Sequence, residues 1–329
     1  MIGCYATGIF PRPSELIEVT RAYERGKVDK ETLEKAFEKA ASKIINEQLS
    51  YGLDFITDGM LKWQDLLRPF TENLKGVKIG SLTRWFNNNT FYRKPIVVDK
   101  IQREKSILEE VCYIRLLPEK VFWKAILPAP YTFVKLSENQ FYKNEENLMF
   151  DYAQALRKEI EHLANLGFKY IQLSDPALVY EPAAAVQLSK DEINKVKEAL
   201  KIAVKGAPAQ TCLQTFFGNF ARILPDALDF PVDHLGIDLY ETSLRDLKAY
   251  SFEKGIALGL VDSRSSLIEN VDELVKVAVE IIDVICHSKE ENVFICPNCD
   301  LEFLPWERAR EKIKVASLVA KRLRDEYYA

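Results

Sequence analysis

Cysteine and carboxylate side chains, the two groups that most readily bind zinc here, lie where short apolar runs of this sequence end. Cys296 and Cys299 are three residues apart, a spacing that allows both sulfur atoms to face one ion. Glu241 follows another apolar run and adds a carboxylate to the same donor set. Two ordinary roles compete with a metal site. The thiols can simply be buried, and Glu241, beside Thr242 and Ser243, can mark a helix N-terminus.

Two aspartates also end apolar runs. Asp58 is followed by glycine and Asp175 by proline. A carboxylate in such a place either contacts a substrate or forms an Asx turn, and the sequence leaves both roles open. Cys212, Gln214 and Phe216 alternate along one run, so they share one face of a strand. Whether that face points into the core or toward the helices is undecided at this stage.

The segment 84–93 reads Arg-Trp-Phe-Asn-Asn-Asn-Thr-Phe-Tyr-Arg. Three consecutive asparagines are unsuited to a core and tolerate left-handed turns. The aromatic and arginine side chains could stack on a planar ring, or they could anchor a loop folded over the site. We expect the pocket beneath this segment, with Trp85 and Asn88 among the substrate-binding residues.

Strand-like runs alternate with amphipathic stretches, which predicts a single (β/α)8 TIM barrel over residues 1–329. The expected strands are 2–6, 55–57, 122–127, 170–173, 210–215, 235–239, 256–261 and 293–295. The helical stretches include 31–50, 147–166, 191–205, 271–286 and 306–324. An insertion at about 61–120 is expected to carry a hairpin with arms 76–79 and 95–98, and a helix. A doubly wound sheet is the alternative, but its Gly-x-Gly-x-x-Gly turn does not follow the first run.

The overall composition excludes several classes of protein. Lys and Arg number 45 against 49 Asp and Glu, so the net charge of −4 does not indicate a nucleic-acid partner. No apolar run reaches about 18 residues, and no secretory signal begins the chain, so neither a membrane nor export is expected. The six cysteines are scattered, which favours reduced thiols in the cytoplasm. With only three histidines, a metal site would depend on cysteine and carboxylate.

Motifs spread over nearly the whole chain match those of one family. They are Phe10-Pro11-Arg12, Gly52-Leu53-Asp54 leading into Asp58-Gly59, the 84–92 segment, Ile171-Gln172-Leu173-Ser174-Asp175-Pro176-Ala177-Leu178, Glu241-Thr242-Ser243 and Asn298-Cys299. Together they resemble the cobalamin-independent methionine synthases, and the Gln-x-x-acid-Pro-Ala-Leu element is the most specific. The resemblance implies a barrel of the methionine synthase/uroporphyrinogen decarboxylase-like type. Family enzymes have two such barrels, of which the C-terminal one holds zinc and is catalytic.

For function, the resemblance implies a methyltransferase of methionine biosynthesis that moves a methyl group from a methyl-folate or corrinoid donor to homocysteine. Asp175 is then the catalytic residue. The substrate-binding residues are Gly8, Arg12, Asp58, Trp85, Asn88, Gln172 and Gln214. Ile9, Met60 and Ser174 depart from the family's homocysteine-binding pattern.

For zinc, the resemblance implies ligands from a His-x-Cys pair on the fifth strand, a Glu after the sixth and a Cys after the eighth. Glu241 and Cys299 match the last two, whereas Gln214-Thr215-Phe216 stands where the pair is expected. Cys212 or Cys296 would have to supply a third ligand. The alternative is a non-catalytic barrel like the family's N-terminal, zinc-free one. Such a barrel would bind the donor and partner a separate zinc-bearing barrel.

Overall fold

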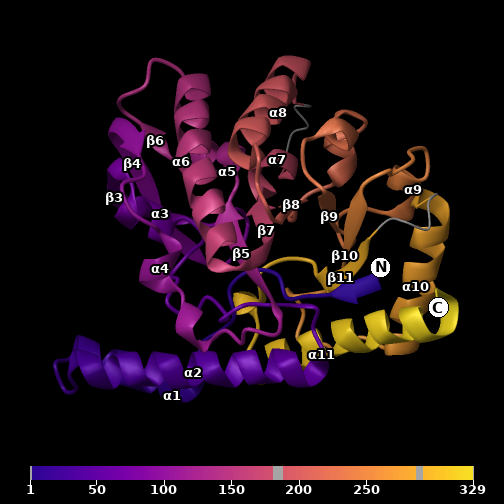
Figure 1. The fold of residues 1–329 in the computed structure, drawn as a ribbon, viewed down its shortest axis with the longest axis horizontal. Helices are drawn as coiled ribbons and strands as arrows, with labels where there is room; N and C mark the ends of the chain where they lie inside the picture. Colours follow the sequence, from indigo (N-terminus) through magenta and orange to yellow (C-terminus); the bar gives the residue numbers. More distant parts are fainter. Residues whose placement is uncertain (1, 181–187, 287–291, 329) are drawn as a thin grey trace.

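Eight parallel strands form a closed barrel, as predicted (Figure 1). The computed structural model describes residues 2–180, 188–286 and 292–328. The hydrogen-bonded order is β1-β11-β10-β9-β8-β7-β5-β2, and a bridge between Tyr5 and Phe55 joins β1 to β2. The strands are β1 Ile2–Cys4, β2 Phe55–Ile56, β5 Phe122–Pro128, β7 Phe168–Ser174, β8 Gln210–Gln214, β9 His234–Asp238, β10 Gly255–Val261 and β11 Val293–Pro297.

Long amphipathic helices cover the outside of the barrel (Figure 1). They are α1 Ser14–Glu24, α2 Lys30–Tyr51, α6 Glu145–Leu166, α8 Lys190–Val204, α10 Val271–Ile285 and α11 Trp306–Arg322. Their ends follow local chemistry: Asp29 accepts a hydrogen bond from the Thr32 N–H at the start of α2, and Gly52 ends that helix with φ 74°. Within the described part of the chain, none of the helices is long and apolar enough to cross a bilayer.

Shorter helices lie mostly in the loops at the ends of the strands. They are α3 Arg68–Asn73, α4 Leu108–Val111, α5 Pro130–Leu136, α7 Pro176–Val179 and α9 Leu244–Leu247. Because α5 and α7 begin directly after β5 and β7, they fix the backbone at the carboxyl ends of those strands.

The predicted hairpin lies between β2 and β5. Strands β3 (Lys75–Arg84) and β4 (Phe91–Gln102) pair antiparallel, and β6 (Glu138–Asn139) adds a short parallel edge. The register sets residue 77 against 97 and residue 79 against 95, which confirms the two predicted arms. Strand β4 contacts α6, so the hairpin is packed against the outer layer of the barrel.

The barrel interior changes character from one end to the other. Near the amino ends of the strands lies an aromatic cluster, made of Tyr5, Phe55, Tyr170, Cys212, Ala257, Phe294 and Cys296. Nearer the carboxyl ends, the inward side chains are polar: Gln172, Gln214, Asp238 and Asn298 are all buried. The aromatic cluster therefore closes one end, and the polar side chains are presented at the end where barrel enzymes bind substrates.

Candidate active site

Asp175, directly after β7, has one committed and one open carboxylate oxygen. Its Oδ1 accepts hydrogen bonds from the N–H and the hydroxyl of Thr132 on α5, at 3.0 and 2.6 Å. Its Oδ2 is buried and has no partner among the described residues. Burial raises the pKa of Asp175 to about 7, although the bonds from Thr132 oppose the shift. A carboxyl group in this state can take up or release a proton near neutral pH.

Two buried amides on β7 and β8 add further open acceptors. Gln172 donates to the hydroxyl of Ser174 at 2.9 Å, and Gln214 donates to the carbonyl of Thr215 at 3.5 Å. The Oε1 atoms of both amides are buried without a partner among the described residues. The register pairs Ser174 with Gln214, so both amides lie on neighbouring strands facing the barrel interior. Buried polar atoms are nearly always paired, so these acceptors suit a ligand that carries N–H or O–H donors.

Asp58, two residues after the end of β2, accepts a hydrogen bond on each carboxylate oxygen. Its Oδ1 accepts from the N–H of Met60 at 3.0 Å, and its Oδ2 accepts from the N–H of Tyr113 at 2.9 Å. Burial raises the pKa of Asp58, and the two backbone bonds oppose that shift. In this structure the side chain forms an Asx turn and ties the end of the hairpin insertion to the barrel. Its assignment as a substrate-binding residue stays a prediction.

Gly8, after β1, is required by a close approach. Its φ is +66°, and a Cβ built there would lie 1.5 Å from Oδ1 of Asp300. That oxygen accepts a hydrogen bond from the N–H of Ile9 at 3.2 Å. The glycine thus allows the loop after β11 to pack on the loop after β1. A contact of Gly8 with substrate stays a prediction.

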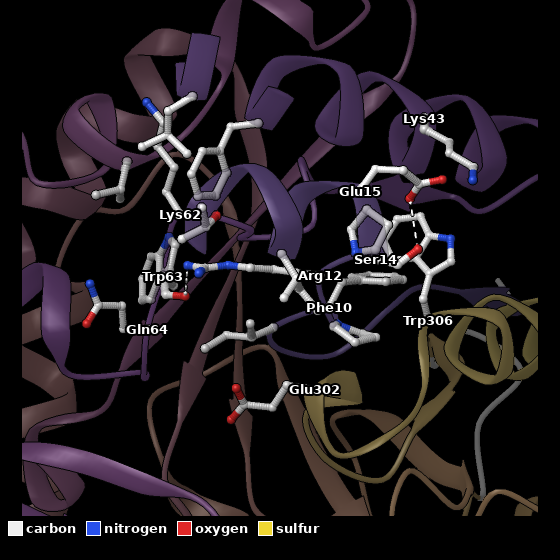
Figure 2. A pocket seen from close by; sticks show the side chains of 18 of the residues that line it. Phe10, Arg12, Ser14, Glu15, Lys43, Lys62, Trp63, Gln64, Glu302 and Trp306 are labelled. Carbon is white, nitrogen blue, oxygen red and sulfur yellow. Dashed lines mark hydrogen bonds between the residues drawn. The ribbon is translucent and has the colours of Figure 1, made fainter. Parts of the chain in front are cut away.

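Arg12 lies in a groove of about 1170 Å³ at the rim of the carboxyl ends, between the α1–α2 pair and the loops after β1, β2 and β11 (Figure 2). The guanidinium donates to the carbonyls of Leu61 and Trp63 at 2.9 and 3.4 Å, and it covers the ring of Phe37. These contacts hold Arg12 across the groove wall. Its predicted contact with substrate would have to be made from this position in the groove wall.

Glu302 faces the same groove below Arg12 (Figure 2). Burial and the neighbouring charges of Asp300 and Asp65 raise the pKa of Glu302 to about 8, while Arg12 opposes the shift. The groove lining holds six glutamates against Arg12, Lys43 and Lys62. This balance disfavours a polyanionic ligand in the groove.

The 84–93 segment is the tip of the hairpin, and it folds over the loops after β7 and β8. Phe86 packs on Tyr180 and Phe217, with ring centroids 4.8 and 5.7 Å apart. Trp85 is buried behind it, and Asn88 closes the turn by bonding to the Trp85 carbonyl. Phe86 and Phe217 both have positive φ, a strained backbone conformation that non-glycine residues rarely adopt. The aromatic anchoring agrees with a loop folded over the site, while contacts of Trp85 and Asn88 with substrate stay predictions.

Glu241 and Cys299, the two residues expected to bind zinc, both lie near Arg264. Oε1 of Glu241 is 2.7 Å from Nη1 of Arg264. Cys299 is fully buried, and its thiol is 3.8 Å from the carbonyl of Asp300. Burial raises the pKa of the Cys299 thiol far above its usual range, and the positive charge of Arg264 opposes the shift only in part. The thiol is therefore protonated at neutral pH.

Cys212 and Cys296, the possible additional ligands, belong to the aromatic cluster. The Cys212 sulfur is 3.9 Å from the Tyr5 hydroxyl. In the same interior, the ammonium of Lys124 donates to the carbonyl of Ala6 at 2.9 Å and lies 3.3 Å from the centre of the Tyr5 ring. Burial lowers the pKa of Lys124 to about 7 and raises the pKa of both thiols.

A family model and the curated relatives of this chain point to the same family. The sequence model described as "Cobalamin-independent synthase, Catalytic domain" matches residues 4–322. The methionine synthase of Saccharolobus solfataricus is 31% identical over 311 residues, which cover 93% of this chain and 90% of that protein. The methionine synthase of Sulfolobus acidocaldarius is 28% identical, over 93% of this chain and 87% of that protein. This chain belongs to the cobalamin-independent synthase family.

Solved structures agree on the fold of this cobalamin-independent synthase barrel. A B12-independent methionine synthase from Shewanella, in complex with selenomethionine, superposes with a TM-score of 0.81 at 20% identity, covering 99% of this chain and 98% of that one. A putative B12-independent methionine synthase from Listeria monocytogenes gives 0.74 at 17% identity, covering 98% and 99%. Membership places the chain among methyltransferases. Because the matching model is that of the catalytic domain, the non-catalytic alternative is not favoured.

The donor set of this synthase barrel does not fit the zinc that the resemblance implied. Among the described residues, no group of three or more His, Cys, Asp or Glu side chains could hold a metal ion. Glu241 is paired with Arg264, Gln214 is a neutral amide in the barrel interior, and the thiol of Cys299 is fully buried. We therefore derive no step through zinc.

Several charged residues of the barrel were not singled out from the sequence. Asp238 ends β9 and accepts from Asn298, Phe217 and Tyr240, whereas the sequence motif pointed to Glu241, three residues further on. Its position at the end of an apolar run was a usable signal. Lys124 was also detectable, since a lysine within an apolar strand is rare. Nothing in the sequence pairs Arg264 with Glu241, because that contact joins two different loops.

Proposed function

We propose that this chain transfers a methyl group from a methyl-folate donor to the thiol of homocysteine and so forms methionine. In this reaction the thiol loses its proton and the sulfur bonds to the methyl carbon. The bond from that carbon to the donor nitrogen breaks, its electron pair stays on the nitrogen, and the nitrogen takes up a proton in place of the methyl group. The names of the curated relatives, methionine synthases, support the acceptor and the product. The scattered cysteines support the cytoplasm as the location.

The single observation that carries the proposal is the open oxygen of Asp175. Oδ2 is buried without a partner among the described residues, and the pKa of about 7 lets it exchange a proton at neutral pH. We assign it as the acceptor of the thiol proton. Thr132 holds the other oxygen and so fixes the direction of the carboxyl group.

The two amides complete the proposed site. The free Oε1 atoms of Gln172 and Gln214 are proposed to accept hydrogen bonds from N–H groups of the bound substrates. The tip of the hairpin, anchored by Phe86, is proposed to exclude water from above. Residues of this chain fill all of these roles, and we propose that the chain transfers the methyl group without a second barrel.

The test is a labelled-methyl assay on the purified chain. Tetrahydrofolate carrying a ¹³C methyl group and homocysteine are supplied, and labelled methionine is measured by mass spectrometry. Wild type and Asp191→Asn, a control at an exposed carboxylate on α8, are expected to form methionine. Asp175→Asn is expected to form almost none. If wild type makes no labelled methionine with this donor but does so with methylcobalamin, the donor is wrong, and if neither works the function is wrong.

A further inference from the structure

The loop after β10 presents a fixed cation where the loops after β9 and β11 meet. The backbone N–H of Arg264 donates to Asp262 at 2.9 Å, and the N–H of Ser263 donates to Asn298 at 2.9 Å. The hydroxyl of Ser263 also lies 3.2 Å from the carbonyl oxygen of Cys299, to which it donates. These bonds hold the base of the arginine in place from two sides.

The guanidinium of Arg264 is directed at the acidic side chains around it. Nη1 lies 2.7 Å from Glu241, and Nε lies 3.9 Å from Asp262. The aromatic ring of Phe217 is 5.9 Å from the guanidinium carbon. The side chain of Arg264 is 31% exposed, so solvent screens these charges only in part. The positive charge also acts on the buried groups Asp238 and Cys299.

Two carboxylates at this place, Glu241 and Asp238, are already engaged. Glu241 is held by the guanidinium. Asp238 accepts from Asn298 and Tyr240 on one oxygen and from Phe217 on the other, at 3.0 to 3.2 Å. A divalent ion would have to break these bonds and approach an arginine of like charge.

We infer that Arg264 takes the place of a metal ion at this end of the barrel: it neutralises Glu241, and the chain binds no zinc there. The inference depends on the proposed function in one respect only, which is that both concern the same end of the barrel. Arg264 is a positioning residue, since it holds Glu241 and borders Cys299 without a step of its own. Thiol deprotonation then falls to a carboxylate, and zinc coordination is not required.

Metal content of the full chain tests this without an activity assay. The purified protein is equilibrated with excess Zn²⁺, passed through gel filtration and measured by elemental mass spectrometry. We expect far less than one zinc per chain. About one zinc per chain that is lost in Cys299→Ser but retained in the control Cys112→Ser would overturn the inference. Zinc retained equally in both variants lies elsewhere and leaves the inference standing.

Cobalt titration of arginine variants gives the complementary result. Wild type and Arg264→Lys, which keeps the positive charge, are expected to show no thiolate–cobalt absorption band. Combining Arg264→Ala with Gln214→His removes the cation and supplies an imidazole, so the band is expected to develop. A band in wild type, lost in Cys299→Ser, would contradict the inference. The wild-type measurements decide the matter even if a variant fails to fold.

The two tests separate this inference from the proposed function. A zinc-free chain that forms no methionine would refute the proposed function and leave the role of Arg264 intact. A chain that forms methionine but holds zinc at Cys299 would refute the inference alone. Activity that survives removal of metals by a chelator is expected if both are right.

Discussion

The ends of β2 and β7 carry the same residue type in the same topological place, and their surroundings make the two aspartates different. Both oxygens of Asp58 are taken by backbone N–H groups, those of Met60 and Tyr113. Only one oxygen of Asp175 accepts hydrogen bonds, from Thr132, and the other has no partner among the described residues. Burial raises the pKa of both carboxyl groups, and hydrogen-bond donors oppose the shift in each. If Asp175 acts as we propose, the number of open acceptor atoms, rather than burial, distinguishes the reactive carboxylate from the structural one.

The largest effect is expected at the open carboxylate. Asp175→Asn keeps an acceptor for Thr132 but removes the proton acceptor, so we expect kcat to fall about 10²- to 10⁴-fold. The folded pKa of Asp175 is raised to about 7, and only the ionised form accepts a proton. The kcat of wild type should therefore rise with pH through about 7. A variant with near wild-type kcat, correctly folded by circular dichroism, would remove Asp175 from the chemistry.

A substitution at Gly8, after β1, is expected to lower the stability of the fold, as a substitution at Asp58 after β2 is. Gly8→Ala places a methyl group on the Asp300 carboxylate in a left-handed backbone conformation, so we expect a loss of about 2–4 kcal/mol in the free energy of unfolding. Gly26→Ala is the matched control, because its φ is +67° and no atom lies within 4 Å. It should cost about 1 kcal/mol. Equal losses in urea unfolding would show that the contact with Asp300 is unimportant.

A smaller loss is expected at the closed carboxylate. Asp58→Asn turns an NH₂ group toward a backbone N–H, either that of Met60 or that of Tyr113, and leaves a buried donor unpaired. We expect a loss of about 1–3 kcal/mol in the free energy of unfolding, with kcat per folded molecule close to that of wild type. A large fall in kcat without a change in stability would instead support the predicted contact of Asp58 with substrate.

The smallest change in stability is expected at the open amide of Gln214. Gln214→Met conserves the volume, and the oxygen that it removes has no partner among the described residues. The free energy of unfolding should therefore change by less than about 1.5 kcal/mol, while KM for homocysteine rises. An unchanged KM would place the substrates away from β8.

The barrel could be predicted from the sequence because the spacing of apolar residues that marks a strand or a helix involves residues close together in the chain. All eight strand-like runs contain strands, and the hairpin arms pair as expected. Local capping also decided the helix ends, as Asp29 and Gly52 show at α2. These features depend on residues within a few positions of each other.

The site could be predicted only in part, because its properties depend on contacts between distant loops. The residues next to Asp58 and Asp175 in the chain leave the same two roles open for both. They differ through Tyr113, 55 residues from Asp58, and Thr132, 43 residues from Asp175. The pairing of Glu241 with Arg264 likewise joins two loops. The family resemblance led us to expect zinc ligands at Glu241 and Cys299, but no local pattern indicated that an arginine would pair with Glu241.

The most direct test of the account is the titration of Asp175 itself. Infrared difference spectra of wild type minus Asp175→Asn, recorded from pH 4 to pH 9, report the carboxylic acid band of this one group. The account predicts that the protonated band disappears with a midpoint near pH 7, since burial raises the pKa to about 7. A band lost with a midpoint near pH 4, the ordinary range for aspartate, would contradict it.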